Sequence, residues 1–124
     1  MAGRIDSFED LRVYRKACDL DFQIFVETKA FPKEERFSLT DQVRRASRSI
    51  GANIAEAWAK RRYSAYFVSK LTDADGELQE TRHWIGRSLA YGYVSADWHR
   101  DCEQRCAYIG GMLGKMIQHP EDFT

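Results

Sequence analysis

The spacing of apolar residues predicts four helices along this chain of 124 residues. Apolar positions recur every three to four residues in four segments, which is the repeat of one face of an α-helix. No segment alternates between apolar and polar residues for long enough to predict a β-strand. The pattern predicts helices over roughly 8–29, 39–60, 64–91 and 96–118. Within the second segment the expected core positions are Leu39, Val43, Ala46, Ile50, Ile54, Ala57 and Trp58.

Local signals mark where these helices begin and end. Ser7 opens a capping pattern before the first segment, and Ser64 and Ser95 precede the third and fourth. Gly92 is placed to end the third helix in a left-handed conformation, and Pro120 ends the fourth. Short joints make consecutive helices antiparallel. We therefore expect one all-α domain over 1–124, an antiparallel up-down-up-down four-helix bundle.

The first segment has more apolar surface than one bundle requires. On a helical wheel of ~100° per residue, its apolar side chains, Phe22 and Phe25 among them, cover an arc of roughly 200°. A helix that buries one face against a single core needs a narrower stripe. The excess predicts that copies of the chain dock together, as a homo-oligomeric ring.

Two further flanks favour docking between copies. Small residues stand opposite the core stripe of the second segment, among arginines, and small side chains permit close helix approach. Acidic residues share a flank of the third segment with Tyr66 and Tyr91, and aromatic side chains are enriched in interfaces. The alternative is that both flanks are ordinary exposed faces, with salt bridges inside one bundle worth ~0.2–1 kcal/mol each. The expected interface residues are Gly51, Ala52, Ala55, Asp73, Glu77, Glu80 and Trp84.

Composition bears on where the protein resides and on which ligands its surface attracts. Three cysteines cannot all pair within one chain, which favours a reducing cytoplasm, and no apolar run has the length of a signal peptide core or membrane span. The formal net charge is zero, which argues against a surface that is basic throughout. Between 44 and 62, however, six basic residues and one acid leave a local excess of +5. The expected phosphate contacts are Arg44, Arg45, Arg48, Lys60, Arg61 and Arg62.

Candidate catalytic and metal-binding groups are few. His99, Cys102 and Cys106 share one side of a helix, but both cysteines fall in the apolar stripe, where cysteine acts as a small core residue. A single Glu-x-x-His pair, from Glu80 to His83, lacks the second copy that di-iron bundles use. No Gly-rich phosphate loop occurs. The sequence predicts no enzyme, no cofactor and no metal.

Three stretches of the chain resemble a known family. They are LRVYRKACDL, FPKEERFSLTDQVRRASRSIGANIAEAWAKR and ADGELQETRHWIGRSLAYGYVS, within a similarity that covers about 8–117. The chain resembles the four-helix-bundle proteins encoded in intervening sequences of bacterial 23S rRNA genes. Those proteins are similar to the accessory variability protein of diversity-generating retroelements, which partners a reverse transcriptase.

The resemblance implies a homopentameric barrel without catalysis or cofactor and a role in binding RNA or DNA. The central motif is matched by Arg44, Arg45, Ser49, Ile50, Asn53, Ile54 and Glu56. The chain departs from it at Gly51, where the family often has Pro, and in charge, because the retroelement relatives are strongly basic. Two hypotheses result: an accessory ring that binds nucleic acid through the basic residues, or a protein–protein interaction scaffold without nucleic acid. In the second, the arginines pair with Asp73, Glu77 and Glu80 of a neighbouring subunit.

Overall fold

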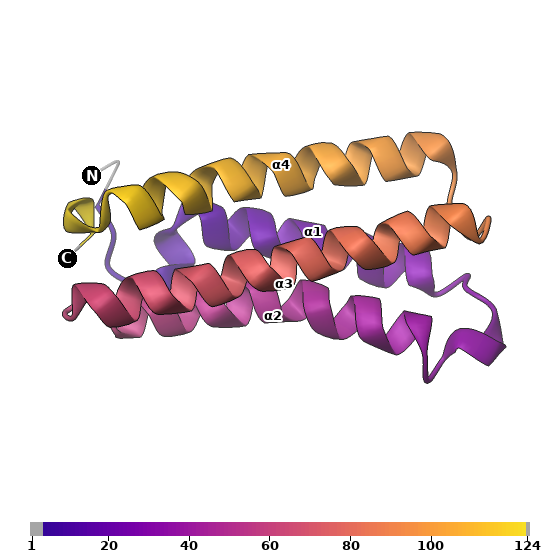
Figure 1. The fold of residues 1–124 in the computed structure, drawn as a ribbon, viewed down its shortest axis with the longest axis horizontal. Coiled ribbons are helices and arrows are strands. Elements are labelled where there is room, and N and C mark those ends of the chain that lie inside the picture. Colours follow the sequence, from indigo (N-terminus) through magenta and orange to yellow (C-terminus); the bar gives the residue numbers. More distant parts are fainter. Residues whose placement is uncertain (1–3, 124) are drawn as a thin grey trace.

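A computed structural model describes residues 4–123, and four α-helices make up most of this part of the chain. Figure 1 shows them side by side, with consecutive helices running in opposite directions. The described residues contain no β-strand, so the all-α prediction is confirmed. The helices are α1 (Arg12–Thr28), α2 (Leu39–Ala59), α3 (Ser64–Ala90) and α4 (Ala96–Gln118), with 3-10 turns at Phe8–Asp10, Lys33–Glu35 and Pro120–Asp122.

One apolar core runs between the four helices. The predicted stripe of α2 is buried along its whole length, from Leu39 to Trp58. Phe67 on α3 and the cysteines Cys102 and Cys106 on α4 are also buried in this core. The hydrogen bond with Cys106, and then burial, raise the pKa of the Cys102 thiol. Both observations agree with a packing role for these cysteines, because reactive and metal-binding cysteines are thiolates.

The start of the first helix differs from the prediction. The capping box between Ser7 and Asp10 is present, but it caps only the 3-10 turn Phe8–Asp10. Leu11 then adopts an extended conformation (φ −71°, ψ 126°) and is buried, so α1 begins at Arg12. The predicted cap is therefore present. The helical turn that it caps stops at Leu11, whose side chain enters the core, and α1 starts after this residue.

The joint between α1 and α2 is held by a carboxylate. Glu35 accepts hydrogen bonds from the hydroxyls of Ser38 (2.6 Å) and Tyr93 (2.8 Å) and from the backbone N–H of Leu39 (3.4 Å). The hydroxyl of Ser38 makes no capping bond to α2, so Glu35 satisfies an N–H of its first turn instead. These bonds lower the pKa of Glu35 and raise that of Tyr93 to about 12.

The remaining joints show one error and two successes of the capping signals. Ser64 is the first residue of α3 and not its cap, since Tyr63 occupies the cap position without a side-chain capping bond. Gly92 has a φ of 79°, as predicted for a left-handed helix end. The N–H of Tyr93 donates to the carbonyl of Ser88, and the N–H of Gly92 donates to that of Leu89. These two bonds are the Schellman pattern. Ser95 caps α4 through the N–H of Trp98.

Candidate nucleic-acid and subunit surfaces

The six predicted phosphate contacts lie in three separate places on the molecule. Arg44 and Arg62 are 18 positions apart, which corresponds to ~27 Å along a helix. Arg44 and Arg48 face α1, Arg45 faces the groove between α2 and α3, and the other three belong to the joint that follows α2. The structure therefore does not bring the six together as one patch.

Arg44 ties α2 to the end of α1. Its Nε donates to the hydroxyl of Thr28 (2.8 Å) and its Nη2 to the carbonyl of Phe25 (3.4 Å). Its guanidinium also lies 4.9 Å from the centre of the Phe25 ring, and that of Arg48 lies 5.9 Å from it. Arg44 is half-buried and bonds to a carbonyl in the last turn of α1, so we leave it out of the phosphate contacts.

Arg45 lies among acids. It forms a 3.8 Å ion pair with Asp41 and lines a groove of about 320 Å³ together with Glu77 and Glu80 of α3. Burial and then repulsion from Glu80 and Asp73 raise the pKa of Glu77. The field of Arg45 is thus compensated within its own chain.

The joint between α2 and α3, residues 60–63, is built on a buried tryptophan. The guanidinium of Arg61 stacks 4.0 Å from the centre of the Trp58 ring, and its Nη1 donates to the Trp58 carbonyl (2.9 Å). Arg61 therefore satisfies a carbonyl at the end of α2, as basic side chains often do. Lys60 and Arg62 are exposed on either side of it.

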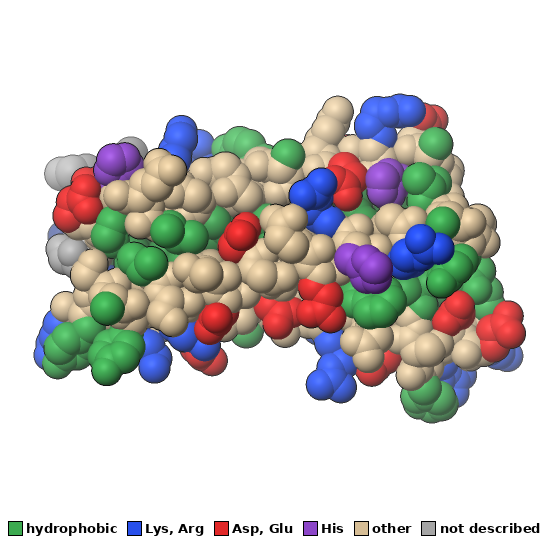
Figure 2. Space-filling model, viewed as in Figure 1, with side chains coloured by type: hydrophobic (Ala, Val, Ile, Leu, Met, Phe, Trp, Pro, Cys, Tyr) green, Lys and Arg blue, Asp and Glu red, His purple; other side chains and the backbone are tan. Residues whose placement is uncertain are grey.

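Two tyrosines accompany these cations. Tyr63 and Tyr66 are each 60% exposed, and their rings meet edge to face with centroids 6.0 Å apart. Lys60 lies 5.8 Å from the centre of the Tyr66 ring. Figure 2 shows hydrophobic side chains flanked by Lys and Arg at the lower left, the end where α2 meets α3 in Figure 1. The sequence analysis placed Tyr66 on the acidic flank of α3, whereas the structure places it beside Lys60.

The charge of this joint is not neutralised by ion pairing. Among residues 4–123, Lys60, Arg61 and Arg62 form no ion pair, whereas Arg45, Lys70 and Arg82 each pair with a carboxylate. The first turn of α3 adds to the positive potential, because it carries no acidic residue and no side-chain cap. Within residues 4–123, Lys33 and Arg36 of the α1–α2 joint also form no ion pair, but Glu34 and Glu35 stand between them. Residues 60–63 contain three cations and no acid, so positive charge at this joint remains open to a ligand.

The small residues of α2 divide between the inside and the outside. Gly51 is buried, and a Cβ added to it would lie 3.5 Å from the Tyr14 ring of α1. The sequence analysis expected Gly51 to contact a neighbouring copy, whereas the structure places it against α1 of its own chain. Ala55 is half-buried and Ala52 is exposed, so an outward surface of small side chains remains on α2.

The predicted acidic flank of α3 is partly used within the chain. Lys70 binds both Glu56 of α2 (2.7 Å) and Asp73 (3.5 Å). The indole N–H of Trp84 donates to Glu80 (3.3 Å). These contacts fit the alternative of salt bridges inside one bundle, and they leave Asp73 exposed.

The wide apolar arc of α1 is visible as exposed side chains. Phe22 is 64% exposed and Val26 is 50% exposed, on successive turns of α1. Ile24 between them is fully buried, so the two point away from the core. They form an exposed apolar pair on α1, on the side where the arc is wider than the core requires.

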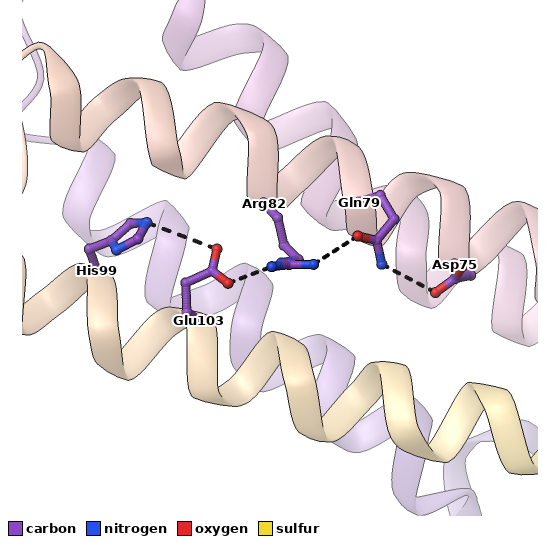
Figure 3. Close-up of polar contacts among 5 residues, drawn as sticks. All are labelled: Asp75, Gln79, Arg82, His99 and Glu103. Atoms are coloured by element: carbon purple, nitrogen blue, oxygen red, sulfur yellow. Dashed lines mark hydrogen bonds and ion pairs between the residues drawn. The ribbon is translucent and has the colours of Figure 1, made fainter.

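A chain of polar contacts bridges α3 and α4 on another face. Arg82 of α3 donates hydrogen bonds to Glu103 of α4 (3.0 Å) and to Gln79 (2.9 Å) (Figure 3). The side-chain amide of Gln79 donates in turn to Asp75 (3.5 Å), and the ring of His99 lies 3.9 Å from the Glu103 carboxylate. Each carboxylate here already has a partner. Within residues 4–123 no three His, Cys, Asp or Glu side chains cluster as metal ligands do.

Comparison with known proteins identifies the family. A solved structure of an S23 ribosomal protein family member of unknown function from Bacteroides thetaiotaomicron is similar to this chain, with a TM-score of 0.76 and 25% identity over 86% of this chain and 95% of that one. No curated protein matches. None of the helices in residues 4–123 has the length and apolar character needed to cross a bilayer. The family model for the 23S rRNA-intervening sequence protein matches residues 9–115. The chain therefore belongs to the 23S rRNA-intervening sequence protein family.

Proposed function

We propose that this protein is a non-enzymatic accessory protein that binds the nucleic-acid backbone through the joint between α2 and α3. The observation that carries the proposal is a run of three cations with no acid among residues 60–63, none of them ion-paired within residues 4–123, in a chain whose formal net charge is zero. Lys60 and Arg62 contact phosphates, and Arg61 holds the joint on Trp58. Arg48 remains a secondary contact, whereas Arg45 is left out because Asp41, Glu77 and Glu80 offset its charge.

The ring is the second part of the proposal. Phe22 and Val26 are exposed on α1, and a homopentamer would bury them against a neighbouring copy. Repetition of the joint in each subunit would multiply phosphate contacts, and each contact to a single strand contributes about 0.7 to the slope of log affinity against log salt.

Binding is tested by fluorescence anisotropy with labelled RNA and duplex DNA at low salt. Lys60→Gln/Arg62→Gln should weaken binding of every sequence and flatten the salt dependence, because two phosphate contacts per subunit are lost. The matched control is Lys33→Gln/Arg36→Gln, which removes the same charge from the joint between α1 and α2. An equal loss in the control would show that total charge, and not the joint, governs binding.

Assembly is tested by native mass spectrometry. Phe22→Glu/Val26→Glu should convert a pentamer into smaller species, because two charges would have to be buried. Gln104→Glu/Ala107→Glu adds the same charge at exposed positions of α4 and should leave the mass unchanged. A wild-type chain that is monomeric at high concentration contradicts the ring.

The interaction scaffold is the competing function, and the groove of Arg45, Glu77 and Glu80 favours it. If the arginines of one subunit pair with these acids of another, Glu77→Lys/Glu80→Lys should dissociate the assembly without any nucleic acid present. A double variant with unchanged native mass would exclude this pairing.

A further inference from the structure

The tyrosines beside the cations of the α2–α3 joint define the kind of nucleic acid. We infer that Tyr63 and Tyr66 form a base-stacking platform and that the ligand of this joint is single-stranded RNA or DNA; this inference rests on the proposed nucleic-acid binding. Proteins that bind single strands without sequence preference combine a positive groove with aromatic side chains on which bases stack.

The first argument is exposure. A tyrosine ring loses favourable apolar contact when it stays in water, and the bundle has a core that takes in Phe67, the residue next to Tyr66. Tyr63 and Tyr66 nevertheless expose 60% of their surface. Their edge-to-face contact fixes the two rings at 78° to each other, which reduces the cost of ordering them for a ligand.

The second argument is the space beside the rings. Tyr63 lines a groove of about 410 Å³ with Ala59, Arg61 and Arg62. This volume lies within the range of small-molecule sites, ~300–1,000 Å³, so it accommodates a nucleobase. The ring supplies an apolar wall and the two arginines supply charge, which is the combination that a base and its phosphate require.

The third argument comes from a comparison with Tyr108, another exposed tyrosine. Tyr108 is 47% exposed and lies 5.9 Å from Lys16, but Asp19 and Asp101 line the same groove. Cations near Tyr108 are thus offset by carboxylates that repel phosphate. The groove beside Tyr63 differs, because Arg61 and Arg62 line it and no carboxylate does.

A duplex does not fit this surface as well as a single strand. Bases in a duplex are stacked on one another, so the rings of Tyr63 and Tyr66 reach only the backbone. In a single strand the base faces are available, and each stacked base contributes ~1–3 kcal/mol. We therefore expect single strands to bind about tenfold more tightly than a strand with the same phosphates and no bases.

The test compares four labelled probes of roughly 15 units, a length within the footprint of single-strand binding folds: oligo(dT), oligo(U), an abasic strand and a duplex. Tyr63→Leu/Tyr66→Leu should lower the affinity for both oligonucleotides to that for the abasic strand while leaving the salt slope unchanged. Tyr63→Phe/Tyr66→Phe should retain wild-type affinity, because stacking needs the ring and not the hydroxyl. The arms with dT and U distinguish DNA from RNA.

The matched control is Tyr91→Leu/Tyr108→Leu, which removes two exposed tyrosines that also lie near cations, Arg87 and Lys16. This variant should bind as the wild type does. If the wild type binds the abasic strand as tightly as the oligonucleotides, the stacking inference fails while backbone binding stands. If no probe binds at low salt, the proposed function itself fails. A reduced native mass for Tyr63→Leu/Tyr66→Leu would mean that the tyrosines are subunit contacts, which also overturns the inference.

Discussion

The two joints at the ends of α2 have similar ingredients and opposite organisation. Both contain basic residues and aromatic rings. In the α1–α2 joint, Glu35 accepts bonds from Ser38, Tyr93 and Leu39, and Phe31 packs against the Tyr93 ring with centroids 5.3 Å apart. In the α2–α3 joint, Lys60 and Arg62 form no ion pair among the described residues. Lys33 and Arg36 of the first joint also form no ion pair among the described residues, and Phe37 there is exposed. The joints differ in their acids, because Glu34 and Glu35 accompany the first set of cations and residues 60–63 contain none. A joint braced by a carboxylate stabilises the fold, whereas one with cations and no acid is available to an anionic ligand.

The largest expected effect comes from removing the support of the ligand-facing joint. Trp58→Ala should lower the free energy of unfolding by about 3–5 kcal/mol, because Trp58 is 9% exposed and belongs to the core. Urea denaturation measures this change. Arg62→Ala at the same joint should change stability by less than about 0.5 kcal/mol. Equal losses in the two variants would mean that the charges, and not the core, hold the joint.

A smaller, pH-dependent effect is expected at the satisfied joint. Hydrogen bonds hold the pKa of Glu35 in the folded protein below its ordinary value of 4.5, so the stabilisation exists above that value and is lost as pH falls through the folded pKa. Glu35→Gln should therefore lower Tm at neutral pH, and the gap from wild type should close in acid. Thermal melts followed by circular dichroism test this. Glu34→Gln, an exposed neighbour with no hydrogen-bond role among residues 4–123, should show no such closing gap.

Midway along α2, a substitution should stabilise the helix that connects the joints. Gly51→Ala is expected to gain about 0.5–1 kcal/mol, because Ala has the higher helix propensity and its Cβ would sit at an ordinary 3.5 Å from Tyr14. Chemical denaturation gives the difference directly. A loss of stability would show that Tyr14 cannot accept the added contact.

The smallest effect is expected in the groove between α2 and α3. The pKa of Glu77 is raised, so the wild type loses stability as pH rises through it. Glu77→Gln should gain less than about 1 kcal/mol at neutral pH, because Glu77 is only partly buried, and nothing in acid, where Glu77 is protonated. A gain that persists in acid would point to a cause other than charge.

The sequence pattern was sufficient to predict the four helices and their core positions, but it predicted the candidate site less well. Apolar periodicity identified the core of α2 from Leu39 to Trp58, because a helix in a bundle must turn one face inward. It could not show that Leu11 would leave the helical path to enter the core. That choice depends on how tightly the other helices pack around it.

The predicted site residues lie apart in the structure because a helical wheel gives the angle of each residue around the axis and not its position along the axis. Tyr66 and Trp84 share an angular sector of α3, but 18 positions separate them by ~27 Å along the axis. Arg44 and Arg61 bind carbonyls at helix ends, and for Arg44 the carbonyl belongs to another helix. The interleaving of tyrosine with basic residues in KRRYSAY was the available signal for the joint.

The position of the last described residues limits how this protein can be attached to anything else. The Phe123 ring lies 6.0 Å from that of Phe67 in the first turn of α3, and Figure 1 shows the last described residues at the same end of the bundle as the α2–α3 turn. An affinity tag or fusion partner placed after Phe123 would start at the end of the bundle that carries the α2–α3 joint, where it would compete with an oligonucleotide for room. The turn at Gly92, at the far end of the bundle, is the better point for a fluorophore or a surface tether.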